Sequence, residues 1–333
     1  MTSSTRTLAA VLAALMIAAV ALTGCSQAGS KSSDAPHQGT PLPVSVRIGT
    51  LPTEDSLPLW VAEKRGYFAT ENVPKVEIVE FQSAQERDAA FASGAIDGFM
   101  GDIIAAANLT AAGKPDTIET VMLGADQSQG RFGIAVAPKS TVTALPQLAN
   151  VPVGTSSATI QEYVLDGLMA EAGVATDSVK VEEVKKVPVR FQLLTSGQLK
   201  AAALPEPFLS LAEQGGAKVL ATDTTAKANL SQTVLVFSNA FLSREGGAAT
   251  VTSVLKAWDL GVNDINKAPD SVRALLVEKA KLPQSLATSY KINTYPTHQL
   301  PSRADVEAVL AWMKSKGYLK ADVTYGQLTG QAE

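Results

Sequence analysis

Residues 83–112 read SAQERDAAFASGAIDGFMGDIIAAANLTAA and hold a helix, a strand and a second helix in close succession. Ser83, with a Glu three residues later, is the pattern of a capping box and predicts a helix over 83–93. Residues 96–100 are short and apolar, as expected of a buried strand, and a second helix is predicted over 102–112. This alternation indicates right-handed βαβ units on a mostly parallel sheet.

The same alternation extends to both sides of this stretch. Before the chain's midpoint we expect further strands at 44–50, 75–81, 117–123 and 132–137. One further helix is expected there, at 57–65. The pattern then restarts, with strands expected at 151–154, 179–184, 199–203 and 217–220 and helices at 157–171, 188–196 and 205–214. Residues 231–238 are again strand-like, and helices are expected at about 246–266, 270–280 and 303–316.

Two βα blocks followed by a helical tail predict an α/β protein with two lobes, each a mostly parallel sheet flanked by helices. Lobe 1 is predicted to comprise residues 44–131 plus 238–333 with the helical C-terminal extension, and lobe 2 residues 138–230. The passages 132–137 and 231–237 are predicted to be the hinge crossovers between the lobes. The resemblance between the two blocks is architectural, because no short-period repeat is present.

The N-terminal residues are predicted to be a targeting segment. Residues 8–21 (LAAVLAALMIAAVA) form an apolar run that is too short for a spanning helix but suits a signal-peptide core. Leu22-Thr23-Gly24-Cys25 follows and resembles a bacterial lipobox, which implies cleavage after residue 24 and lipidation of Cys25. The alternative is an ordinary secretory signal that contains a Cys. Residues 25–43 are predicted to be a flexible tether that spans on the order of 25 Å.

Composition excludes several classes of protein. The 333 residues carry 28 Lys+Arg and 32 Asp+Glu, and a net charge of -4 gives no support for nucleic-acid binding. A single Cys rules out a disulfide framework and a Cys-based zinc site, and His37 and His298 are too few for a multi-His metal centre. We therefore expect no metal and no cofactor, and the motifs of the common catalytic sites are absent from the sequence.

Four motifs carry a resemblance to a known family. They are, in chain order, PLWVAEKRGYF at 58–68, AAFASGAID at 89–97, AAG at 111–113 and LPEPF at 204–208. In order and spacing they resemble substrate-binding lipoproteins of ABC importers, in the branch that handles nitrate, sulfonates, taurine and thiamine-pyrimidine precursors. The resemblance implies a type II periplasmic-binding-protein fold, an ABC permease as partner and a monomer. Lys200 departs from the pattern, which has Asp there.

The ligand of an open α/β sheet lies beyond the carboxyl ends of its strands, so the predicted strand ends supply the candidate site. In lobe 1 they place Thr53, Glu54 and Asp55 after the first strand and Gly101 and Asp102 after the third. The segment before the first crossover adds Gln129 and Arg131, and lobe 2 adds Thr155, Ser156, Ser157, Thr159 and Glu206.

The hydroxyls at 155–159 sit at a predicted helix start, where free backbone N–H groups suit an anion or a carbonyl. The alternative is plain capping, in which Ser156 or Ser157 bonds the first turn of the helix. Capping is likewise the alternative for Glu54, Asp55 and Asp102, each of which lies at or before a helix start.

The charges near the cleft leave two ligand classes open. Carboxylates that face the cleft would repel a sulfonate or other oxyanion and favour a neutral or amine-bearing nitrogen heterocycle such as a pyrimidine. Arg131 would favour the sulfonate if it is free, and it could instead pair with one of the acids. The aromatic side chains near the cleft, Trp60, Tyr163 and Phe208, are expected to pack in the core rather than stack on a ligand.

The predicted function is therefore capture of a small solute between two closing lobes, with delivery to a permease and no covalent chemistry. One alternative is a sensor subunit that reports ligand occupancy to a signalling receptor. The other is an enzyme similar to the pyrimidine-synthesising relatives, which use a His and a Cys-rich motif that this sequence lacks.

Overall fold

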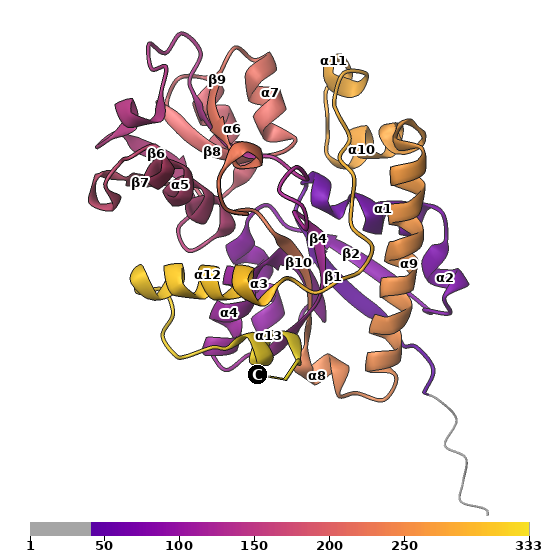
Figure 1. Ribbon diagram of the computed structural model, residues 1–333. Coiled ribbons are helices and arrows are strands. Elements are labelled where there is room, and N and C mark those ends of the chain that lie inside the picture. Colours follow the sequence, from indigo (N-terminus) through magenta and orange to yellow (C-terminus); the bar gives the residue numbers. More distant parts are fainter. Residues whose placement is uncertain (1–40, 333) are drawn as a thin grey trace, which may run out of the picture. The chain divides into compact units, whose positions relative to one another are not determined.

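Two five-stranded sheets organise the molecule (Figure 1). In the first sheet β1 pairs in parallel with β2 and β3, and β10 lies antiparallel between β3 and β4. Its strands, in spatial order, are β2 (Val76–Glu80), β1 (Val46–Thr50), β3 (Gly98–Asp102), β10 (Thr233–Ser238) and β4 (Asp116–Leu123). This computed structural model describes residues 41–332, apart from the side chains of 284 and 285, so the predicted leader, Cys25 and His37 lie outside the described residues.

The second sheet repeats this arrangement, with β6 parallel to β7 and β8 and with β5 antiparallel between β8 and β9. Its strands, in spatial order, are β7 (Lys180–Glu183), β6 (Pro152–Thr155), β8 (Ala201–Pro205), β5 (Phe132–Val136) and β9 (Lys218–Thr222). Each predicted sheet is therefore present and mostly parallel. In each sheet the antiparallel strand directly follows, in sequence, a strand of the other sheet.

The two passages predicted as crossovers form the antiparallel strands β5 and β10. Strand β5 follows β4 in sequence but pairs within the second sheet, and β10 follows β9 but pairs within the first. The chain passes between the sheets just before each strand, at residues 124–131 and 223–232. The hinge role of these connections, and the division into two moving lobes, stay predictions.

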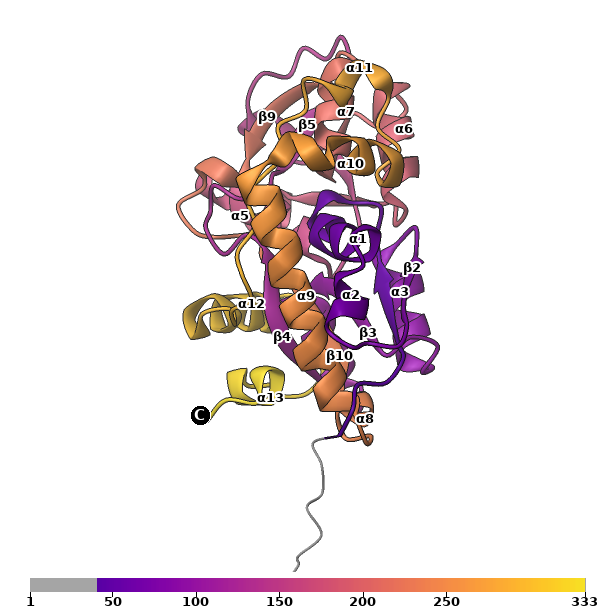
Figure 2. The same ribbon diagram turned by 90° about the vertical axis from the view of Figure 1, so that its right-hand side faces the viewer.

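Helices cover both faces of each sheet, as βαβ connections require. Around the first sheet lie α1 (Leu57–Lys64), α2 (Tyr67–Thr70), α3 (Ala84–Ala92), α4 (Ile103–Ala111), α8 (Asn239–Leu242), α9 (Gly247–Lys267), α10 (Arg273–Lys279), α11 (Gln284–Ala287), α12 (Arg303–Ser315) and α13 (Tyr325–Thr329). Around the second lie α5 (Ile160–Glu171), α6 (Val187–Thr195) and α7 (Phe208–Gln214). Figure 2 shows the long helix α9 running beside α1 and α2, with α12 and α13 apart from it.

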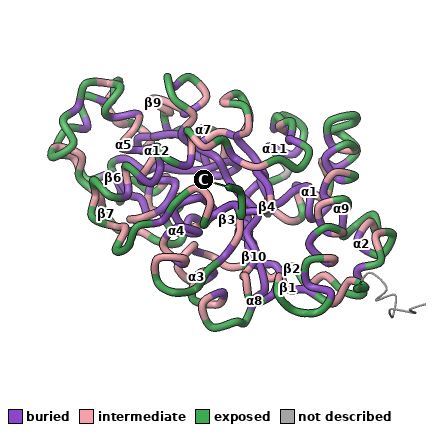
Figure 3. The backbone as a smooth tube through the Cα atoms, turned by 60° about the horizontal axis from the view of Figure 1, so that its bottom comes forward, coloured by how far each residue is buried: buried purple, intermediate pink, exposed green. Residues whose placement is uncertain are grey.

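Apolar residues at helical spacing explain where α9 lies. Val251, Val254, Trp258, Val262 and Ile265 recur every three or four residues, and all five are buried. They pack with α1 in one cluster on one face of the first sheet, while α3, α4 and α12 contribute to a separate cluster. Figure 3 shows the buried strands β3, β4 and β10 enclosed by more exposed segments.

Trp60 belongs to the α1–α9 cluster and is 2% exposed, so its predicted core packing is confirmed. Within residues 41–332, no helix has the length and apolar character needed to cross a membrane. The same described residues contain no group of three His, Cys, Asp or Glu side chains that could hold a metal ion.

Candidate functional site

A cavity lies where the carboxyl ends of strands from both sheets meet. Its free space for the centres of water-sized molecules is about 40 Å³. One water needs about 10–15 Å³ on this measure, so the cavity holds only a few waters. Eight of the predicted site residues line it: Thr53, Glu54, Asp55, Gly101, Asp102, Arg131, Thr159 and Glu206. The strand-end rule thus located the cavity.

Asp102 ends β3 and joins the two halves of the site. Its Oδ1 accepts a hydrogen bond from the backbone N–H of Ala105 at 2.8 Å, which confirms the predicted N-cap of α4. Its Oδ2 accepts one from the backbone N–H of Ile160 at 3.3 Å, the first residue of α5 on the other sheet. Asp102 is 5% exposed, and burial raises the pKa of its carboxyl group.

Glu54 and Asp55 form a 3-10 turn before α1, and neither caps that helix through its side chain. The Glu54 carboxylate instead accepts hydrogen bonds from the Tyr290 hydroxyl (2.6 Å) and the Asn293 amide (2.5 Å). Burial, with the nearby Glu206 charge, raises the pKa of Glu54 to about 8. Burial also raises the pKa of Asp55, which accepts a hydrogen bond from the Thr53 hydroxyl at 2.6 Å.

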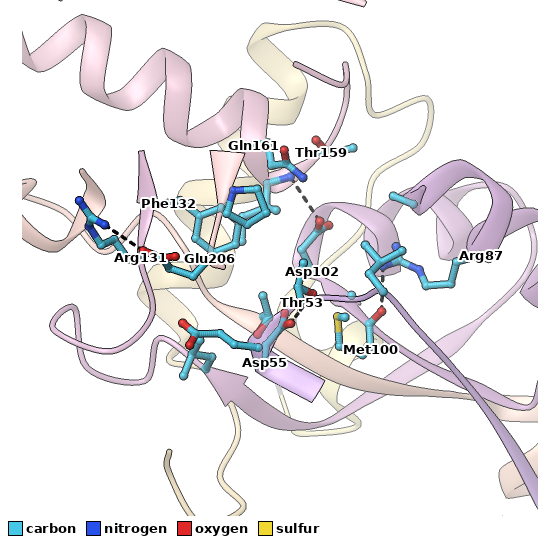
Figure 4. A pocket seen from close by; sticks show the side chains of 18 residues that line it. Thr53, Asp55, Arg87, Met100, Asp102, Arg131, Phe132, Thr159, Gln161 and Glu206 are labelled. Atoms are coloured by element: carbon cyan, nitrogen blue, oxygen red, sulfur yellow. Dashed lines mark hydrogen bonds and ion pairs between the residues drawn. The ribbon is translucent and has the colours of Figure 1, made fainter. Parts of the chain in front are cut away.

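Arg131 is paired, which decides between the two alternatives left open for it. Its Nη1 lies 2.9 Å from Glu206 Oε1 (Figure 4). The same Nη1 lies 2.8 Å from Glu213 Oε2. Burial raises the pKa of Glu206, while hydrogen bonds from Ser210 and Arg131 oppose the rise. An arginine held by two carboxylates has little charge left over for a sulfonate.

Arg87 and Gln161 also line the cavity, and the sequence analysis did not identify them. Arg87 is 1% exposed, donates to the Asp88 carboxylate and the Met100 carbonyl, and lies over the Phe99 ring. Gln161 is 8% exposed, and its Oε1 has no hydrogen-bond partner within the described part of the chain. Both are early helical residues, and the sequence signal that could have found them is a polar residue in the first turn after a strand end.

The other four candidates do not line the cavity. Gln129 accepts from the Asp126 backbone, and Thr155 is fully buried in β6. Ser156 accepts from the Gln85 amide of the other half at 2.7 Å, and the Ser157 hydroxyl donates to Glu183.

The alternative considered for these hydroxyls, that Ser156 or Ser157 caps α5, is wrong. The N-cap position is Thr159, whose side chain makes no cap bond, since the turn runs two residues further than the pattern suggested. The cap of α5 comes from Asp102, on the other sheet.

The other residues named in the sequence analysis lie outside this cavity. Phe208 is buried beside Phe191, with ring centres 5.9 Å apart, and Tyr163 packs edge-on against Trp312 of α12 at 5.2 Å. Lys200, at the departure from the family pattern, is exposed just before β8.

Four carboxyl groups and two guanidinium groups line the cavity. One guanidinium is shared between Glu206 and Glu213, and the other is engaged by Asp88 outside the lining. All four carboxyl groups are held in position by hydrogen bonds. The surplus of acid suits a ligand that donates hydrogen bonds or carries positive charge.

Comparison with families gives one match. Residues 39–267 match the model of the NMT1-like family, which is more than half of the chain. No curated protein sequence matches this chain.

Solved structures share the fold at low sequence identity. The alkanesulfonate-binding protein SsuA from Xanthomonas axonopodis pv. citri, bound to MOPS, has a TM-score of 0.72 and 18% identity over 84% of this chain and 96% of that one. The aliphatic sulphonate binding protein SsuA from Escherichia coli gives 0.69 and 19%, over 87% and 92%. The nitrate-binding protein NrtA from Synechocystis PCC 6803 gives 0.70 and 15%, over 86% and 84%. The two sheets therefore have the arrangement of periplasmic binding proteins.

Proposed function

The chain belongs to the NMT1-like family, and from that premise we propose that it is an extracytoplasmic solute-binding protein of an ABC importer. The observation that carries the proposal is a cavity between the strand ends of two similar sheets, lined by residues of both. A solute held there contacts both halves at once, so its binding energy favours the closed arrangement. The neighbours named as sulfonate- and nitrate-binding proteins support this role and fit the expectation that the chain is not an enzyme.

The solute that the cavity favours is small and neutral or cationic. Glu54, Asp55, Asp102 and Glu206 surround it, and Arg131 is neutralised by its two partners. Glu54, whose pKa is about 8, stays protonated at neutral pH, but a sulfonate or nitrate has no N–H to donate to these acids and would be repelled by those that are ionised. A nitrogen heterocycle with an amino group, such as an aminopyrimidine, offers N–H donors and an apolar ring face, and this second class is the one we propose. Because the cavity as it stands holds only a few waters, the two halves must move apart to admit such a ring.

Delivery and anchoring complete the proposal. A lipid on Cys25 and the 25–43 tether would hold the protein at the outer face of a membrane, and a permease there would recognise the closed form. One copy contains a whole cavity, so a monomer suffices.

Native mass spectrometry of residues 26–333, which include every described element, tests the binding role. Mild unfolding should release a small molecule of defined mass, and that molecule should raise the melting temperature when it is added back. If no solute is released and a panel of aminopyrimidines, amines, sulfonates and nitrate leaves the melting temperature unchanged, the proposed function is wrong.

The anchor is tested in the full chain. Wild type expressed in a bacterial host should partition with membranes and incorporate a labelled fatty acid, and Cys25→Ser should abolish both. Equal labelling of the two proteins would contradict the lipid anchor. Co-purification of the wild type with a permease rather than a receptor separates the transport role from the sensor alternative.

A further inference from the structure

Asp102 bridges two helix starts with one carboxylate. Each oxygen serves a different helix, Oδ1 the first turn of α4 on the first sheet and Oδ2 the first residue of α5 on the second. Figure 4 shows the side chain pointing from β3 toward residues 159–161. A capping role alone accounts for the bond to Ala105, but it does not account for the bond to Ile160, which lies 58 residues away.

The start of α5 is where an oxyanion would gain most. It is a twelve-residue helix whose first residues, Ile160 and Gln161, line the cavity, and the N–H groups of a helix start favour negative charge. Two N–H groups at this end, that of Ile160 and one just before the N-cap, are already engaged by carboxylates of this chain. Ala158 N–H donates to Glu162 at 2.7 Å, and Ile160 N–H donates to Asp102 at 3.3 Å.

A second observation comes from the next residue of α5. Gln161 lines the same cavity, is 8% exposed, and its Oε1 has no hydrogen-bond partner within the described residues. A buried carbonyl oxygen without a partner costs free energy that a donor from a ligand would recover. Gln161 and Asp102 therefore both line the cavity and both carry an acceptor oxygen. A ligand that donates N–H groups could bond to both.

We propose that Asp102 is the specificity-determining residue of this cleft, because its carboxylate occupies the place on α5 that an oxyanion would need. This inference rests on the proposed solute-binding function and says which solutes the site refuses. Removing the charge while keeping the shape opens the α5 start to an anion. Keeping the charge confines the site to ligands that donate hydrogen bonds.

The test uses two probes of nearly equal shape, methanesulfonate, which is an anion, and methanesulfonamide, which is neutral and carries N–H donors. Dissociation constants are measured for wild type and for Asp102→Asn. The Asn side chain keeps an oxygen for the α4 cap but has no charge. Asp177→Asn is the matched control, because it removes one exposed carboxylate from the second half and lies outside the cavity.

We expect wild type and Asp177→Asn to prefer the sulfonamide by at least tenfold, and Asp102→Asn to shift that ratio at least tenfold toward the sulfonate. Asp102→Ser, which keeps a capping hydroxyl, should shift it in the same direction if Asp102→Asn folds poorly. A wild type that binds the sulfonate as tightly as the sulfonamide would overturn the proposal. An unchanged ratio in both Asp102 variants would overturn it as well.

A measurement without ligand separates this inference from the proposed function. Amide hydrogen exchange at Ile160 should accelerate at least tenfold in Asp102→Asn and remain as in wild type in Asp177→Asn. Equal exchange in all three proteins would show that the bridge is absent and would overturn the proposal for Asp102. If the Ile160 amide responds as expected while no protein binds any solute, the bridge stands but Asp102 determines no specificity, and the proposed function fails with it.

Discussion

Arg87 and Arg190 occupy the same position in the two halves of the fold. Each is the fourth residue of a nine-residue helix that joins an edge strand of its sheet to the central strand, β2 to β3 for Arg87 and β7 to β8 for Arg190. Arg87 donates to the Asp88 carboxylate and to a backbone carbonyl, whereas Arg190 donates only to the Val184 carbonyl. Its Nε and Nη2 have no partner among the described residues, although the side chain is fully buried. Only the Arg87 copy lines the cavity.

Replacing Arg190 should therefore not destabilise the protein. Burial lowers the pKa of Arg190 to about 9, which marks the cost of holding the charged form in the core. We expect Arg190→Met to raise the free energy of unfolding at pH 7 by about 1–4 kcal/mol, as for other buried charges replaced by apolar side chains of similar volume. Arg87→Met, the matched variant, should lower it by about 2–3 kcal/mol. Urea unfolding measures both changes, and a loss in both variants would contradict the difference between the two positions.

Lys316 in the C-terminal helical region forms two ion pairs with α5 of the other half. Its Nζ lies 2.9 Å from Glu162 Oε1 and 2.9 Å from Asp166 Oδ2, and both carboxylates are largely buried. Lys316→Met leaves two neighbouring carboxylates without a counter-charge, so we expect the free energy of unfolding to fall by about 3–5 kcal/mol.

Lys314→Met is the control for that prediction. Lys314 pairs with Asp322, and both side chains are more than half exposed. Its loss should change the free energy of unfolding by less than about 1 kcal/mol. Equal melting temperatures for the Lys314 and Lys316 variants would show that the contact between α5 and the C-terminal region does not stabilise the fold.

Glu54 should make stability depend on pH. Its pKa is raised from 4.5 to about 8, so the carboxyl group stays protonated in the folded protein while the unfolded chain ionises. The stabilisation is thus complete below pH 4.5 and is lost as pH rises toward 8, by an amount on the order of 5 kcal/mol. Glu54→Gln should flatten this fall between pH 5 and 8 in chemical unfolding. The raised pKa values of Asp55, Asp102 and Glu206 act in the same direction and leave a residual slope. A slope identical to wild type would rule out Glu54 as the source.

Gly101 was a candidate for ligand contact, and the structure shows a packing reason for it. A Cβ at this position would lie 2.6 Å from the Phe99 ring and 3.1 Å from Arg87 Cζ. Gly101→Ala should therefore push Arg87 in the cavity wall and lower the free energy of unfolding by about 1–3 kcal/mol. Solute affinity should fall with it, which calorimetry with the solute released from wild type would measure. Unchanged stability would show that the ring moves aside freely.

Local chemistry explains which parts of the fold could be predicted. The capping pattern at Ser83 holds, since its hydroxyl accepts from the Glu86 N–H, and the Glu86 carboxylate accepts from the Gln82 N–H rather than that of Ser83. Asp102 caps α4 as expected. Such bonds join residues three or four positions apart, so the sequence contains both partners.

The start of α5 shows where this reasoning fails. Three hydroxyl residues at 155–157 are a strong capping pattern, yet the helix begins at Ile160. The hydroxyls of Ser156 and Ser157 bond Gln85 and Glu183 instead, which lie on other elements. Tertiary partners outcompeted the local ones, because a hydroxyl gains as much from a distant donor or acceptor as from its own helix.

The sequence by itself determined the order of strands and helices, their periodicity and the rule that the ligand site lies at the strand ends. Those features depend on side-chain period and on bonds between near neighbours. Only the tertiary structure decided the charge of the site. The partners of Arg131, Asp102 and Glu54 lie 75, 58 and 236 residues away along the chain. Because the charge that a ligand meets depends on which acids and bases are already paired, it could be determined only once both sheets had come together.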